Sequence, residues 1–98
     1  MNFDEARKRA VRDAIFDVGH LYEGEPDQIL EDHFEEAEHC WMFFRNRSID
    51  VPEASLRNFA YVFGKHGGGR CVNDYWDEPT RLAEYLKTCS DYFATHTE

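Results

Sequence analysis

Between residues 13 and 44 the sequence has no lysine and no arginine, although this segment contains ten acidic side chains. The other 66 residues carry ten acids and eleven bases, so the net charge of −9 lies in one third of the chain. Because nucleic acids are polyanions, this local excess of carboxylates argues against DNA or RNA as a ligand. It favours a basic partner, above all another protein.

The sequence also lacks an apolar run of the roughly 18 residues that a membrane-spanning helix needs, so we expect no membrane association. Its first residues, MNFDEARKRA, are charged and have no apolar segment like that of a secretory signal. Cysteine is scarce, with three in the chain, so at most one disulfide could form. We expect reduced thiols and a cytoplasmic location for a single domain over residues 1–98.

Apolar residues recur at spacings of three and four, which is typical of amphipathic helices. The pattern predicts four helices, over residues 4–22, 26–46, 51–64 and 77–95, with a glycine-rich loop over residues 66–76. The second helix has the most regular apolar seam, formed by Leu30, Phe34, Ala37, Trp41 and Phe44. Four amphipathic helices with short connections predict an all-α fold, a small four-helix bundle.

In the helix predicted over residues 26–46, four acidic side chains fall along one side of the apolar seam: Asp27, Glu31, Glu35 and Glu38. Four aromatic side chains fall off the predicted apolar stripes or in a loop: Phe16, Phe43, Tyr75 and Trp76. Acidic residues speed the encounter with a basic protein, and aromatic residues anchor the complex. These eight residues are the predicted partner-binding site, although a charge run of this kind can also be only a solvated surface.

Motifs for catalysis or metal binding are weaker than the charge pattern. Glu36 and His39 have the Glu-x-x-His spacing of di-metal helical bundles, but such sites need a second motif. The segment 67–70, Gly-Gly-Gly-Arg, could surround an anion, but it lacks the lysine and hydroxyl of a phosphate-binding loop. His66 and Cys71 could form a base and a nucleophile, but the glycines between them fix no geometry. We therefore predict no enzymatic activity, no cofactor and no metal site.

From the second predicted helix onward the chain resembles small all-helical bacterial immunity proteins of type VI or contact-dependent toxin systems. The residues that carry the resemblance are Ala37-Glu38, Asp50 with Ala54-Ser55-Leu56, Asp77-Glu78-Pro79, Leu82 and Leu86-Lys87. The resemblance implies a non-enzymatic protein that blocks the active site of a toxin, and it carries over no individual binding residue. Immunity proteins against nucleases or nucleotide-degrading toxins are often acidic because the clefts of those toxins are basic.

The sequence thus predicts a non-catalytic, acidic immunity or inhibitor protein that binds and blocks a basic toxin or enzyme. It leaves a homodimer open. One alternative is a phage-type protein that imitates DNA and blocks a nucleic-acid-binding complex. Another is a small helical metal-binding oligomer that uses Glu36 and His39.

Overall fold

The structure, a computed structural model, describes residues 1–49 and 59–95. In chain order these residues form α1 (Phe3–Val18), the 3-10 helices η1 (Gly19–Leu21) and η2 (Pro26–Gln28), β1 (Leu30–Glu36), β2 (Cys40–Arg45), β3 (Phe59–Gly64), β4 (Gly69–Asn73) and α2 (Pro79–Thr95). The fold is α+β, so the predicted all-α four-helix bundle is wrong. No helix within the described ranges is both long enough and apolar enough to span a bilayer.

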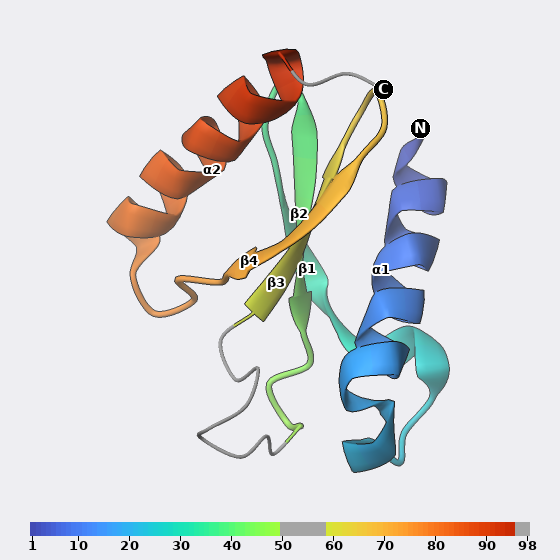
Figure 1. The fold of residues 1–98 in the computed structure, drawn as a ribbon. Helices are drawn as coiled ribbons and strands as arrows, with labels where there is room; N and C mark the ends of the chain where they lie inside the picture. Colours follow the sequence, from blue (N-terminus) through green and yellow to red (C-terminus); the bar gives the residue numbers. More distant parts are fainter. Residues whose placement is uncertain (50–58, 96–98) are drawn as a thin grey trace.

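The strands form one antiparallel sheet in the order β1-β2-β3-β4, so β1 and β4 are its two edges. In the middle of the sheet, Phe43 of β2 lies opposite Phe34 of β1 and Tyr61 of β3. The two long helices lie on opposite sides of this sheet (Figure 1). Helix α1 packs against β1, β2 and β3, whereas α2 packs against β2 and β3.

The central strands β2 and β3 are covered by a helix on both faces. Successive side chains of a strand point to opposite faces. In β2, Trp41 and Phe43 therefore pack with α1, while Met42 and Phe44 belong to the core beneath α2. Neither face of β2 or β3 meets water, so both strands are nearly continuous runs of apolar residues. Such runs are usual for fully buried strands.

The helix predicted over residues 26–46 is therefore wrong, because the segment forms η2, β1 and β2. The helix predicted over residues 51–64 is also wrong in its last part, where residues 59–64 form β3. Its first part lies outside the described residues. The loop predicted over residues 66–76 contains the strand β4.

Helix α1, predicted over residues 4–22, is confirmed over residues 3–18. It begins after Asn2, whose side-chain oxygen accepts the Glu5 N–H at 2.9 Å and so caps the first turn. The face toward the sheet is a stripe of small residues, and Ala6, Ala10 and Ala14 are all 0% exposed. Small side chains let the helix backbone approach the aromatic residues of β2 and β3.

A buried polar network ties the end of α1 to the sheet. The Tyr61 hydroxyl donates to Asp17 Oδ2 at 2.8 Å and accepts from Arg45 Nε at 3.0 Å, while Arg45 Nη2 lies 3.5 Å from the same carboxylate oxygen. Arg45 is 4% exposed, so its charge needs this anionic partner. Asp17 is thereby neutralised within the molecule and adds little to the surface charge.

Helix α2, predicted over residues 77–95, is confirmed over residues 79–95. Leu82, Cys89 and Phe93 form its buried face against the sheet. The helix crosses so close to β3 that a Cβ atom at Gly64 would lie 2.5 Å from the Phe93 ring. Only glycine fits there without displacement of the helix.

Candidate functional site

The acidic block of the sequence lies largely on an edge strand of the sheet. Strand β1 carries four carboxylates, here called the acidic edge: Glu31, Asp32, Glu35 and Glu36. Charged side chains on an edge strand discourage pairing with the strands of other molecules. The acidic edge therefore favours contact through side chains over simple strand addition.

Within the described residues, Lys65 is the one lysine or arginine whose side chain forms an ion pair with the acidic edge, and its partner is Glu36. Glu35 Oε1 lies 3.1 Å from Nε2 of His33, a hydrogen bond between neighbours on one side of the strand. Glu31 Oε1 accepts the backbone N–H of Arg47 at 2.9 Å. The contacts of Glu31 and Glu35 orient their carboxylates but do not neutralise them with a fixed cation.

One side of β1 is open because α2 does not reach it. Glu35 lies opposite Met42, whose side chain belongs to the core beneath α2, so Glu35 points to the α2 side of the sheet. His33, two residues earlier, is exposed and Glu35 is half-buried. This side of β1 is thus accessible to a partner.

Trp76 borders this open side and is held in place by its neighbours. Its ring lies 5.0 Å from the Phe44 ring and 6.0 Å from the His33 ring, measured between centroids. The Arg47 guanidinium lies 4.5 Å from the Trp76 centroid and pairs with Asp74 at 2.8 Å. Asp74 Oδ1 also accepts the backbone N–H of Trp76 at 3.1 Å. The indole is therefore held in place both by its backbone and by the side chains around its ring.

Together these contacts bring side chains from β1, from the segment just after β2 and from the β4–α2 connection to one place. We call this cluster the Trp76 surface, and its members are Glu31, His33, Glu35, Arg47 and Trp76. Arg47 is occupied by Asp74, so the free charge of the cluster is negative.

Of the eight predicted site residues, the structure brings together Glu31, Glu35 and Trp76. Tyr75 is next to Trp76 in the chain, but its ring packs on Tyr85 at 5.0 Å, and its φ of 48° is the left-handed conformation that non-glycine residues rarely adopt. That backbone conformation turns the two neighbouring aromatic side chains in different directions.

The other four predicted residues lie elsewhere. Asp27 is in η2 and Glu38 is in the turn after β1, beyond opposite ends of that strand. Phe16 is 88% exposed but belongs to α1, on the other side of the sheet. Phe43 is 0% exposed between β1 and β3, so it is a core residue and not an anchor. Its assignment was wrong because it assumed the period of a helix.

The sequence pattern did not indicate His33, Arg47 or Asp74 as residues of a partner-binding site. Arg47 and Asp74 meet only because β2 and β4 belong to one sheet, which no local pattern indicates. Asp74 did have a local signal, since an aspartate that accepts the N–H two residues later forms an Asx turn.

The motifs considered for chemistry do not assemble into a site. Among the residues that the structure describes, no three His, Cys, Asp or Glu side chains are placed to share a metal ion. Glu36 pairs with Lys65 at the end of β1, while His39 lies in the following turn. Cys71 is exposed on β4, and desolvation raises the pKa of its thiol, which disfavours the thiolate that a nucleophile requires.

Comparisons of the chain with protein-family models, with curated proteins and with solved structures found no match.

Proposed function

We propose that the protein is a non-catalytic inhibitor that binds a basic partner protein through the Trp76 surface and the acidic edge. The observation that carries the proposal is the position of Glu31 and Glu35 on the open side of β1, beside a fixed tryptophan. Carboxylates without a fixed cation steer a basic partner toward the site. An aromatic side chain that is already immobilised loses little entropy when a partner covers it.

A toxin or enzyme with a basic cleft is the partner class that fits this surface, and an immunity protein of a bacterial toxin system is the corresponding role. The resemblance to immunity proteins adds support for the role only, because the all-helical fold that it implies is not the fold of this chain. We propose action in the cytoplasm, where the three free thiols would stay reduced.

The test uses four versions of the protein as affinity baits in lysate: the wild type, Glu31→Lys with Glu35→Lys, Trp76→Ala, and Glu84→Lys. Glu84 is an exposed glutamate of α2, so its reversal controls for a Glu→Lys change outside the site, with half the charge change of the double variant. We expect a basic protein that the wild type and Glu84→Lys retain and that the other two lose. The purified partner should then bind the wild type about 10-fold more weakly when the salt rises from roughly 50 to 300 mM, because salt screens exposed charges.

The captured partner should also lose its activity when one equivalent of the wild type is added. Equal retention by all four baits, or an affinity that does not change with salt, would show that this surface is not the binding site. Circular dichroism of each bait checks that the substitutions leave the fold intact.

A further inference from the structure

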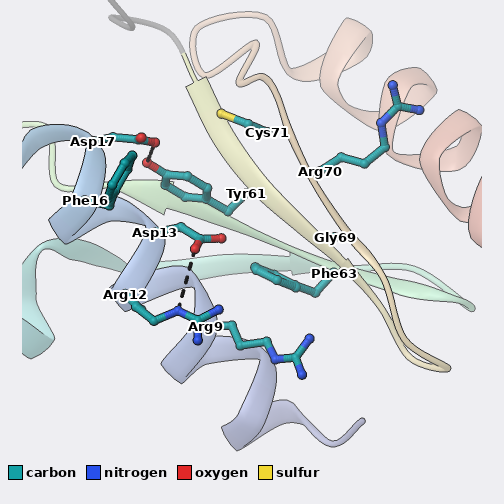
Figure 2. A pocket seen from close by; sticks show the side chains of 10 residues that line it. All are labelled: Arg9, Arg12, Asp13, Phe16, Asp17, Tyr61, Phe63, Gly69, Arg70 and Cys71. Atoms are coloured by element: carbon teal, nitrogen blue, oxygen red, sulfur yellow. Dashed lines mark hydrogen bonds and ion pairs between the residues drawn. The ribbon is translucent and has the colours of Figure 1, made fainter. Parts of the chain in front are cut away.

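A groove of about 380 Å³ runs between α1 and the edge strand β4, on the side of the sheet opposite the Trp76 surface (Figure 2). Helix α1 packs on β1, β2 and β3, so the side of β4 that faces α1 is left uncovered. The residues of β4 on this side, Gly69, Cys71 and Asn73, are all exposed. We call this feature the α1–β4 groove.

Phe16 lies at the rim of the α1–β4 groove and is 88% exposed, far more than any other large apolar side chain among the described residues. Its ring stands beside Asp17 and Tyr61 in Figure 2. The neighbouring strand is exposed too, so a chain segment that lies along β4 would cover both the ring and the strand. Such coverage removes apolar surface from water and is favourable.

The two edges of the sheet differ in charge, and this difference decides which segments each can accept. Strand β1 carries four acids and no lysine or arginine, whereas β4 carries Arg70 and no acid. An acidic strand would be repelled at β1. At β4 it would meet α1, which presents Arg9 and Arg12 to the groove together with Asp13 and Asp17. Arg45 neutralises Asp17, so the two arginines outweigh the one remaining carboxylate.

These two arginines are available to a ligand. Within the described ranges Arg9 forms no ion pair, and Arg12 has only a distant contact of 3.9 Å with Asp13. Figure 2 shows both guanidinium groups toward the end of the groove that contains Phe63 and Gly69. Arg70 points away to the α2 side, where its guanidinium lies 4.8 Å from the Tyr92 ring.

We propose that β4 is a docking edge for an extended acidic segment of a partner protein, which adds a fifth strand to the sheet. Backbone hydrogen bonds to β4 would give the segment its register, as in other cases of strand addition. An apolar side chain of the segment covers Phe16, and its carboxylates lie near Arg9 and Arg12. The surface is independent of the Trp76 surface, so the protein can hold a basic and an acidic partner at the same time.

The test is an NMR titration of the 15N-labelled protein with two capped seven-residue peptides, one alternating glutamate with valine and the other lysine with valine. The acidic peptide should shift the amide signals of residues 69–73 and bind more tightly than the lysine peptide. The substitutions Arg9→Glu and Arg12→Glu together, and Phe16→Ala alone, should each weaken binding about fivefold, the typical effect of losing a few exposed contacts. Lys87→Glu, a charge reversal of the same kind on the exposed side of α2 with half the charge change of the double variant, should leave the affinity unchanged.

Four results would overturn the proposal. One is the absence of shifts at residues 69–73 at millimolar acidic peptide. Another is equal binding of the lysine peptide, and the third is a shift centred on β1 instead of β4. If the signals of β4 depend on protein concentration without any peptide, the edge pairs with a second copy of the chain, and the proposal of a different partner is wrong.

Discussion

At the scale of single residues, Cys40 illustrates how burial controls acid–base chemistry. It is 0% exposed between β2 and α2, and this burial, with Cys89 nearby as a smaller cause, raises the pKa of its thiol to about 12. Near neutral pH the thiol is therefore protonated and a poor nucleophile. Burial also links the titration of this group to the stability of the fold.

We predict that the protein loses stability as the pH rises above 9. The thiol of Cys40 ionises near pH 9.0 in the unfolded chain but only at about 12 in the folded one, so the unfolded state releases its proton first and is favoured. Between pH 8 and pH 10 this should lower the free energy of unfolding by about 1 kcal/mol. Urea unfolding under reducing conditions measures it.

The matched variant is Cys40→Ala, which is less stable at every pH because it leaves a small cavity, but whose stability should fall less between pH 8 and pH 10. Identical pH slopes for the two proteins would exclude Cys40 as the cause.

At the scale of single elements, α1 depends on its alanines. Ala6, Ala10 and Ala14 have no exposed surface, so no space separates the helix from the aromatic residues of the sheet at these positions. Larger side chains there would push α1 away from the sheet, including the end at which Asp17 meets Arg45 and Tyr61.

We predict that Ala10→Leu lowers the free energy of unfolding by about 2–3 kcal/mol, the usual cost of overpacking a tight core. Ala83→Leu, on the exposed face of α2, is the control and should change stability by less than about 0.5 kcal/mol. Thermal or urea unfolding distinguishes the two. A similar small effect for both substitutions would mean that α1 moves freely on the sheet.

The elements differ in how well their sequences predict them, and the reason is physical. Helices α1 and α2 lie on the surface, so each has one apolar stripe, and both were predicted. Strand β2 is buried on both faces, so its sequence does not alternate, and its residues Trp41 and Phe44 also fit a helical stripe with Leu30 and Phe34. The informative signal was the unbroken apolar run over residues 40–44, which is short for a helix and typical of a buried strand.

The sequence predicted part of the candidate site. Glu31 and Glu35 came from the acidic block and Trp76 from its place in a predicted loop. Their proximity depends on the pairing of strands far apart in the sequence, and on the bond between Arg47 and Asp74. Phe43 was misassigned because a helical wheel points its side chain away from the predicted core. In the strand β2 the same side chain is fully buried.

At the scale of the whole molecule, the net charge of −9 opposes folding because the compact state brings like charges together. The acidic edge concentrates this repulsion along β1, and Asp32 lies exposed in the middle of it. Salt should relieve this repulsion within the folded protein.

We predict that the free energy of unfolding rises by about 1 kcal/mol when NaCl rises from roughly 10 to 200 mM, as the screening length falls from about 30 Å to below 10 Å. Asp32→Asn should raise the stability at low salt and reduce the salt effect, whereas Glu84→Gln on α2 should change both less. Urea unfolding at the two salt concentrations gives the values. A stability that is unchanged or lower in high salt would contradict the prediction.

The placement of a helix on each side of the sheet also determines how the protein exchanges its amide hydrogens with solvent. The amides of β2 and β3 are bonded within the sheet and shielded above and below, so no local opening exposes them. Their deuterium uptake should follow complete unfolding and report its free energy directly, while β1 and β4 exchange sooner through fraying at the two edges. A single exchange experiment would thus rank the strands from the middle of the sheet outward.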